Sequence, residues 1–294
     1  MGTNVLLFGG SGQVGTELQR LAPPNWRIVA PARVELDIAD SRAVSEMFAS
    51  CRWGLVINAA AYTEVDRAET DIAEAWRINA LGPAILTEAS ARAATPMIHL
   101  STDYVFDGKK AEPYCEDDAV APLGVYGASK LGGEQAVRTG NPRHVILRSA
   151  WIVSAHGRNF VKTILRLAGE RSLLRVVDDQ RGNPTSAFDL AGVVIGIGQR
   201  LTTVSGAAPA GTYHFVNAGE ATWFELAQTV LARAATRGRK VPPIEAIPSR
   251  DYPTPAKRPA NSRLATTKLQ QDFDIVPRQW RQAIATIVDE LMQS

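Results

Sequence analysis

Near its N-terminus the chain reads Val5-Leu6-Leu7-Phe8-Gly9-Gly10-Ser11-Gly12-Gln13-Val14-Gly15, and this stretch decides the fold. An apolar run leads directly into glycines at positions 9, 12 and 15, and a helical pattern follows. A strand, glycine turn and helix in this order let the backbone approach a pyrophosphate at the positive end of the helix dipole. A flexible glycine turn is the alternative, but the position between strand and helix favours dinucleotide binding.

Short apolar runs alternate with helical patterns through the first half of the chain, which is typical of a parallel sheet with crossover helices. The expected strands are Asn4–Phe8, Arg27–Ala30, Leu55–Asn58, Met97–Ser101 and Val145–Arg148. The expected helices are Gln13–Leu21, Ser41–Ser50, Asp71–Asn79, Pro83–Ala94 and Tyr126–Arg138. Gly82 should break the chain before Pro83 opens a new helix. The pattern predicts a Rossmann-like, doubly wound parallel sheet.

The alternation loosens after residue 150, where helical patterns cover Phe160–Gly169, Ala187–Leu201, Trp223–Ala235 and Pro277–Leu291. Ser186 and Thr222 are the expected N-caps of two of them. The proline-rich stretch 241–259 should lack regular structure and form an ordered loop. We therefore expect a dinucleotide-binding domain over residues 1–150. Residues 151–294 should form mainly a smaller α/β substrate domain, with segments returning to the first.

Bulk composition excludes several classes of protein. The 294 residues are 45% hydrophobic and 21% charged, as in ordinary globular proteins. A net charge of +2 gives no reason to expect a nucleic-acid or membrane-surface partner. The first 150 residues are net acidic and the remainder net basic, which suits a small polyanionic ligand. Cys51 and Cys115 show no metal spacing, and the apolar N-terminal run is too short for a signal, so we expect a cytoplasmic protein with free thiols.

The residues after the second expected strand bear on cofactor choice. A site for NAD often has a carboxylate there for the ribose 2′-hydroxyl. This chain reads Pro31-Ala32-Arg33 instead. A guanidinium can pair with the 2′-phosphate of NADPH, so we expect NADPH as cofactor, with NADH open as a second one. Asp37 and Ile38 should border the adenine.

Tyr126 and Lys130 lie four residues apart at an expected helix start, so they share one helix face. A nearby ammonium favours phenolate and should lower the pKa of Tyr126. Tyr126 could then give a proton to a carbonyl oxygen as hydride arrives at its carbon. Thr102 ends the strand Met97–Ser101, where open α/β sheets bind ligands, and its hydroxyl could hydrogen-bond the reacting oxygen. Surface placement of the Tyr–Lys pair is the alternative.

Taken together, these motifs resemble the extended short-chain dehydrogenase/reductase superfamily and, within it, the dTDP-4-dehydrorhamnose reductase family. The matching segments run over nearly the whole chain: Leu7–Gly15, Asn58–Glu69, Ser101–Gly108, Pro122–Gly127, Arg148–Trp151, Asp179–Thr185 and Arg258–Leu264. The segments Val65-Asp66-Arg67-Ala68-Glu69 and Arg258-Pro259-Ala260-Asn261-Ser262 are more specific than the superfamily motifs.

The resemblance implies reduction of C4 of dTDP-4-dehydro-L-rhamnose by NAD(P)H, with Tyr126 as proton donor and Lys130 as its electrostatic partner. It implies a catalytic set of Tyr126, Lys130 and Thr102. It implies cofactor contacts from Gly9, Ser11, Gly12, Gln13, Val14, Arg33, Asp37, Ile38, Ala59, Ala60, Ala61, Tyr62, Tyr126 and Lys130. It implies substrate contacts from Thr102, Asp103, Tyr126, Trp151, Asn159 and Arg258.

The resemblance also implies a homodimer, with Mg²⁺ bridging interface carboxylates among which Glu17 would stand. This chain has Phe188-Asp189 where a glutamate is expected, which argues against the metal. The four histidines show no ligand spacing, so we expect no catalytic metal. Basic residues of the second half, Arg158, Lys162, Lys257, Arg258 and Arg263 among them, are candidates for the substrate diphosphate.

Two other functions remain open. An epimerase or dehydratase of the same superfamily would first oxidise a sugar hydroxyl with tightly held NAD, and Asp103 leaves room for that chemistry. A non-catalytic regulatory subunit, like the β subunit of methionine adenosyltransferase that resembles the same family, would bind a catalytic partner. Presence of Thr102, Tyr126, Lys130 and Trp151 together favours the enzyme.

Overall fold

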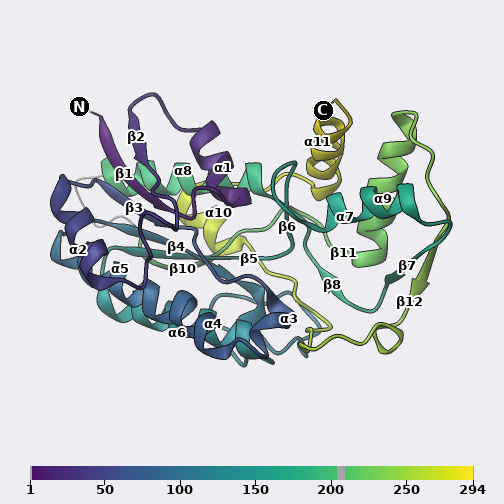
Figure 1. The fold of residues 1–294 in the computed structure, drawn as a ribbon, viewed down its shortest axis with the longest axis horizontal. Helices are drawn as coiled ribbons and strands as arrows, with labels where there is room; N and C mark the ends of the chain where they lie inside the picture. The colour runs from purple at the N-terminus through teal and green to yellow at the C-terminus, as the bar shows by residue number, and fades with distance from the viewer. Residues whose placement is uncertain (1, 204–208, 294) are drawn as a thin grey trace.

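The structure is a computed structural model that describes residues 2–203 and 209–293. Its centre is a parallel sheet of six strands among the described residues, in the order β10-β5-β4-β3-β1-β2 (Figure 1). The strands are β1 Thr3–Phe8, β2 Trp26–Val29, β3 Leu55–Asn58, β4 Met97–Thr102, β5 His144–Ser149 and β10 Gly211–His214. Strand order reverses at β1, which pairs with β2 on one side and β3 on the other. The predicted Rossmann-like sheet is confirmed.

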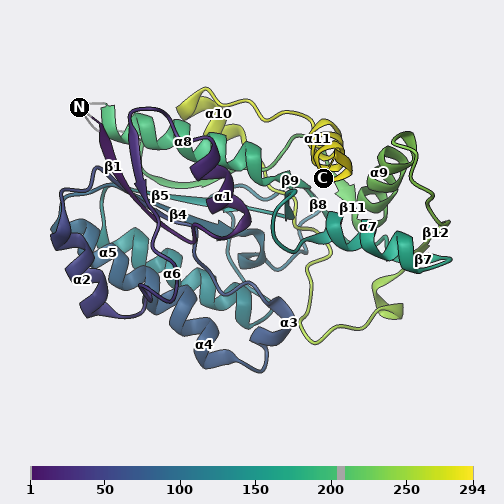
Figure 2. The ribbon, with the colours of Figure 1, turned by 45° about the horizontal axis from the view of Figure 1, so that its top comes forward.

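Both faces of the sheet are covered, and the alternation along β1 shows why its apolar run is continuous. Val5 and Leu7 belong to the apolar core on one face, while Leu6 and Phe8 belong to the core on the other. Successive side chains of a strand point to opposite faces, so a strand covered on both must be apolar throughout. Helices α1, α8 and α10 lie on one side and α2, α5 and α6 on the other (Figures 1 and 2).

The long helices follow the sequence pattern closely. Their bounds, with the short helical turns, are α1 Gln13–Arg20, α2 Ser41–Ser50, α3 Val65–Ala68, α4 Ile72–Trp76, η1 Arg77–Leu81, α5 Gly82–Arg92, η2 Asp103–Val105, α6 Val125–Gly140, α7 Phe160–Glu170, α8 Ala187–Thr203, α9 Trp223–Thr236, η3 Ser249–Asp251, α10 Thr267–Phe273 and α11 Trp280–Gln293. The predicted cap at Thr222 is present as a capping box with Glu225. Ser186 Oγ accepts from the Asp189 N–H at 3.5 Å.

The predicted break at Gly82 was wrong. Gly82 is helical, and the segment η1 carries the chain from α4 into α5 as a π-helix. Pro83 has no N–H for the carbonyl of Asn79 four residues earlier, which would leave a gap in an α-helical ladder. A wider π turn just before the proline allows the helix to continue across that gap.

Most of the second half forms a smaller lobe beside the sheet, to the right in Figure 1. Its apolar core joins α7, α9, α11 and the strand β7. The short strands are β6 Ile152–Val153, β7 Leu174–Val177, β8 Arg181–Gly182, β9 Thr185–Ser186, β11 Ala221–Thr222 and β12 Ile244–Ile247. Here the proline-rich stretch was predicted wrongly, because Ile244–Ile247 has no proline and pairs in parallel with β7. Proline lacks an N–H only at its own position, so four residues between prolines can still form ladder bonds.

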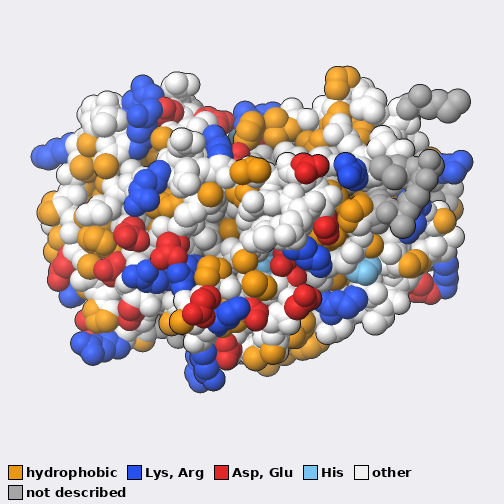
Figure 3. Space-filling model, turned by 180° about the vertical axis from the view of Figure 1, so that it is seen from behind, with side chains coloured by type: hydrophobic (Ala, Val, Ile, Leu, Met, Phe, Trp, Pro, Cys, Tyr) orange, Lys and Arg blue, Asp and Glu red, His pale blue; other side chains and the backbone are white. Residues whose placement is uncertain are grey.

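Segments of the second half also return to the main sheet. Strand β10 pairs with β5, and α8 packs on the same face as α1. On the face shown in Figure 3, Lys and Arg side chains lie among Asp and Glu side chains. Among the residues described, no helix is both long enough and apolar enough to cross a membrane.

Candidate active site

A cleft of about 640 Å³ opens at the carboxyl ends of the central strands, next to the point where strand order reverses. Ligands bind open α/β sheets at this position. Residues that the sequence selected line it together: Gly9, Ser11, Gly12, Gln13, Val14, Arg33, Asp37, Ile38, Ala59, Ala60, Ala61, Thr102, Asp103, Tyr126, Lys130, Trp151 and Asn159. Residues from the N-terminal glycine loop and from as far along the chain as Asn159 therefore line one continuous cleft.

The glycine loop has the geometry that a pyrophosphate site needs. Gly9 has φ of +83°, and a Cβ there would lie 2.5 Å from the backbone of Ala59. A Cβ on Gly15 would lie 2.1 Å from the Gly9 carbonyl oxygen. Helix α1 starts after Gly12, which has no side chain that could cap the helix. The first N–H groups of α1 are therefore not bonded by a capping side chain. These features fit a dinucleotide phosphate.

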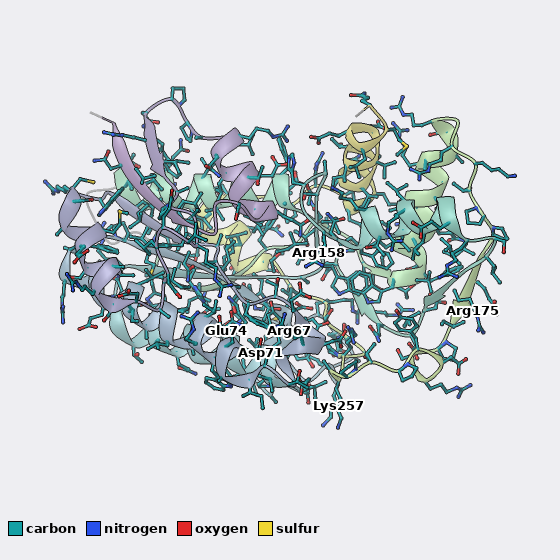
Figure 4. All side chains as sticks on the ribbon, in the orientation of Figure 1. Arg67, Asp71, Glu74, Arg158, Arg175 and Lys257 are labelled. Carbon is teal, nitrogen blue, oxygen red and sulfur yellow. The ribbon has the colours of Figure 1, made fainter. Side chains whose placement is uncertain are left out.

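Gln13 joins the glycine loop to the smaller lobe. Its Oε1 accepts from Ser154 Oγ at 2.9 Å and from Asn159 Nδ2 at 3.0 Å. Asn159 also caps α7, since its Oδ1 accepts from the Lys162 N–H. The helix start of α7 is thereby held against the expected cofactor loop, with Arg158 next to it where the two lobes meet (Figure 4).

At the buried end of the cleft, Thr102, Tyr126 and Lys130 lie together. Thr102 ends β4, and Tyr126 and Lys130 stand one turn apart at the start of α6. Tyr126 forms a side-chain hydrogen bond with Thr102. The Lys130 ammonium donates to the Leu100 carbonyl oxygen at 2.6 Å. Two hydroxyls and a lysine thus converge on the cleft.

The expected effect of Lys130 on Tyr126 is not what the structure shows. Burial raises the pKa of Tyr126 to about 12, and Asp103 adds to this while the Thr102 hydrogen bond opposes it. The Lys130 ammonium donates to the Leu100 carbonyl oxygen and does not offset this rise. Burial also lowers the pKa of Lys130 to about 8, although Glu134 raises it. Tyr126 therefore keeps its proton across neutral pH, which is the form a proton donor must have.

The opposite end of the cleft holds an exposed ion network. Arg33 Nη2 lies 2.8 Å from Glu74 Oε1. Arg77 Nη2 donates to the same Glu74 oxygen at 2.8 Å, and Arg77 Nη1 lies 2.8 Å from Asp37 Oδ2. These ion pairs lower the pKa of Glu74, with the Arg77 hydrogen bond as the largest cause. Glu74 lies in the helical layer below the sheet (Figure 4). Its carboxylate is shared by the guanidinium groups of Arg33 and Arg77.

Trp151 stands in a strained conformation on the cleft wall. Its φ of +47° is in the left-handed region, which costs free energy for any residue with a Cβ. Its indole stacks on Trp223 with ring centroids 3.6 Å apart. A Cβ at Gly182 would lie 2.4 Å from the same indole, so only glycine fits there. Two contacts from the second half of the chain, with Trp223 and Gly182, hold this ring in place.

Sequence reasoning missed two aromatic residues of the site. Tyr104 lines the cleft and meets Tyr126 edge to face at 5.5 Å. Trp223 supports Trp151 from the first turn of α9. Tyr104 lies inside the quoted segment Ser101–Gly108, so its neighbours gave a signal. Trp223 gave none, because its contact with Trp151 depends on the folding of the smaller lobe.

Two predicted site residues do not line the cleft. Tyr62 packs against the apolar core on one sheet face, and its hydroxyl donates to Asp71 at 3.1 Å. Arg258 forms a two-pronged ion pair with Asp66, at 2.8 and 3.1 Å. Because the paired carboxylate is 192 residues away, no local pattern could have revealed this partner.

Comparison with known proteins places this arrangement in a family. A family model described as RmlD substrate binding domain matches residues 3–293. The dTDP-4-dehydrorhamnose reductase of Sinorhizobium fredii is 42% identical over 97% of this chain and 96% of its own length. The crystal structure of a Clostridium acetobutylicum dTDP-4-dehydrorhamnose reductase is 35% identical, with a TM-score of 0.92 over 98% of this chain and 99% of that one. The Bacillus anthracis enzyme, solved in complex with NADP, is 32% identical with a TM-score of 0.92, over 99% and 100% of the two chains.

Proposed function

Because the chain belongs to the RmlD substrate binding domain family, we propose that it is an NAD(P)H-dependent oxidoreductase that reduces the C4 keto group of dTDP-4-dehydro-L-rhamnose to give dTDP-L-rhamnose. One observation carries the proposal: Thr102, Tyr126 and Lys130 converge at the end of a cleft whose other wall is a dinucleotide-type glycine loop. Chains that lose catalysis have no reason to keep this set together.

Each residue of the buried end has a chemical task in this reaction. A bound nicotinamide supplies the hydride. Tyr126 holds a proton next to the substrate oxygen and gives it up as negative charge develops there. Thr102 orients that oxygen by hydrogen bonding, and Lys130 contributes positive charge and a donor for the cofactor ribose. Thr102 and Lys130 are buried, and Tyr126 is partly exposed to the cleft, so the low dielectric around the two buried groups strengthens their electrostatic effect.

NADPH is the cofactor we propose, with NADH as a second. Arg33 supports this choice because it lines the cleft and stands where the adenosine 2′-phosphate would reach. Its ion pair with Glu74 weakens the preference, since the carboxylate already neutralises part of its charge. Asp37 and Ile38 would border the adenine.

We propose that residues 151–294 mainly hold the nucleotide-sugar substrate. Trp151 offers an apolar surface to the deoxysugar, and Asn159 lies at the start of α7, where a diphosphate is favoured. Arg158 is highly exposed on the cleft wall and is our candidate cation for that diphosphate, although it would have to give up its 2.9 Å ion pair with Glu64. Arg258 would have to leave Asp66 in order to reach the substrate.

A bridging Mg²⁺ does not enter this proposal. Glu17 already pairs with Arg20 at 2.8 Å, and Asp189 pairs with Arg278 at 2.7 Å. Phe188 is exposed beside Arg20 at the position where a further carboxylate was expected. We propose a homodimer that needs no metal, and a sedimentation measurement with and without EDTA tests it.

A coupled assay tests the reaction itself. dTDP-glucose is converted by a 4,6-dehydratase and a 3,5-epimerase, this protein is added, and loss of NADPH absorbance is followed. Stoichiometric NADPH loss with formation of dTDP-L-rhamnose is the expected result. Turnover of another nucleotide sugar with no net cofactor consumption would identify an epimerase or dehydratase instead. Cofactor binding without turnover of any sugar nucleotide would favour the regulatory subunit.

A further inference from the structure

We propose that Asp103 is a positioning residue, which decides whether the single proton of Thr102 is available to the reacting carbonyl of the substrate. The inference rests on the proposed function, because it concerns how that carbonyl is held. It gives Asp103 a task that acts through Thr102 rather than through direct contact with the sugar.

The Thr102 hydroxyl is already engaged by neighbouring groups of the protein. Its Oγ1 accepts from the Tyr104 N–H at 3.2 Å, and the Tyr126 hydroxyl lies beside it. Thr102 Oγ1 also donates to Asp103 Oδ1 at 3.0 Å. A hydroxyl has one proton and two lone pairs. While Thr102 gives that proton to Asp103, it has none for the substrate oxygen, which can only accept.

The Asp103 carboxyl lies in surroundings that disfavour its charge. The residue is 2% exposed, and its Oδ2 is buried with no hydrogen-bond partner among the described residues. Thr102 donates to its Oδ1, and the Ser262 hydroxyl lies close enough to favour the ionised form of this carboxyl. Leaving an ionised oxygen buried and unpaired is costly, so the site favours the neutral acid. Burial accordingly raises the pKa of Asp103 to about 7.

Two states follow from this geometry. An ionised Asp103 is a charged acceptor and keeps the Thr102 proton, because hydrogen bonds to charged groups are the stronger ones. A neutral Asp103 is a weak acceptor, so the substrate carbonyl can compete for the proton. The neutral state is then the one that holds the keto group for transfer, and it is lost as pH rises through the pKa of Asp103.

Other titrating groups around Asp103 do not share its range. Tyr104 on the same turn and Tyr126 from α6 face it, and burial raises the pKa of both. Lys130 follows Tyr126 by one turn of α6, and its pKa of about 8 lies higher. Arg258, on the loop that leads to the uncharged Ser262, and its partner Asp66, on α3, both act on Tyr104.

The test is the pH profile of kcat/KM for the keto sugar at saturating NADPH, between pH 5.5 and 7.0, where Lys130 stays mostly protonated. In the unmodified protein kcat/KM should fall about twofold across this window, as for one group of pKa near 7 that must be protonated. Asp103→Asn cannot titrate, so its profile should be flat. Thr102→Val removes the hydroxyl through which Asp103 acts, so its lower activity should also be flat.

A second variant, Ser262→Ala, keeps the proposal testable if Asp103→Asn does not fold. Ser262→Ala removes a hydroxyl whose nearness favours the ionised carboxyl, so the fall should move to higher pH while NADPH affinity stays unchanged. A fall that persists unchanged in Asp103→Asn, or does not move in Ser262→Ala, overturns the proposal. Absence of any turnover by the unmodified protein would instead refute the proposed function, so the two failures are distinguishable.

Discussion

The two ends of the cleft differ in their exposure and in how their charged groups are paired. At the nicotinamide end Lys130 and Asp103 are each 2% exposed and sit under two hydroxyls. At the adenosine end the Arg33 side chain is 71% exposed and shares Glu74 with Arg77. Burial shifts the pKa of Lys130 and Asp103 strongly, whereas solvent screens the ion pairs of the exposed end.

This difference predicts which substitutions should change kcat and which should change cofactor affinity. An isolated charge in a dry site interacts strongly with developing charge, so changes at the buried end should act on kcat. Exposed ion pairs contribute little, so changes at the adenosine end should act on cofactor affinity and be small. The following substitutions test this contrast in order of expected size.

Tyr126→Phe should have the largest effect. The ring stays and the proton source is lost, so kcat should fall about 10²–10⁴-fold with NADPH affinity nearly unchanged. Steady-state kinetics and NADPH titration measure both quantities. Retention of more than about a tenth of the unmodified kcat would mean that Tyr126 is not the acid.

Lys130→Met should come next. It removes buried positive charge and leaves the Leu100 carbonyl without its donor, so kcat should fall about 10- to 100-fold and NADPH should bind more weakly. Burial lowers the pKa of Lys130 to about 8, so the unmodified enzyme should lose activity above that pH as the ammonium deprotonates. The Met variant should lack this alkaline loss. Its persistence would show that another group is responsible.

Arg33→Ala belongs to the exposed end and should act on KM. Loss of a charge-assisted contact to the 2′-phosphate should raise KM for NADPH about tenfold, and NADH should hardly be affected. Comparison of kcat/KM for both cofactors in the two proteins measures this. Equal losses for NADH and NADPH would remove Arg33 from the 2′-phosphate site.

Glu74→Gln should have the smallest effect, with the opposite sign. The amide oxygen can still accept from Arg33 and Arg77, so the network keeps its shape, but a carboxylate no longer competes with the phosphate. NADPH should bind about two- to fivefold more tightly, with NADH unchanged, and the gain should shrink at high salt. Weaker NADPH binding would mean that Glu74 organises the arginines instead of competing for them.

Local patterns predicted the sheet and most of the site, because those parts depend on short segments. The glycine loop, the strand that ends at Thr102 and the helix that starts near Tyr126 each carry their signal within about ten residues. Their meeting in one cleft follows from the parallel order of strands, whose carboxyl ends share one edge.

The features that sequence reasoning missed depend on distant contacts or on balance between competing effects. Arg258 was expected at the substrate, but its pairing with Asp66 joins two loops far apart in the chain. The pKa of Tyr126 was expected to fall, but burial outweighs a lysine that is already engaged by Leu100. Tyr62 was expected at the cofactor, but its ring packs in the core.

Transfer of labelled hydride tests the central claim most directly. The protein is given dTDP-4-dehydro-L-rhamnose and NADPH that carries deuterium at both C4 positions of the nicotinamide, and the product is examined by mass spectrometry and NMR. We expect dTDP-L-rhamnose heavier by one mass unit, with the deuterium at C4 of the sugar, and much slower formation of this product by Tyr126→Phe. Unlabelled product, deuterium at another carbon, or formation of the labelled product by Tyr126→Phe at an unchanged rate would contradict this.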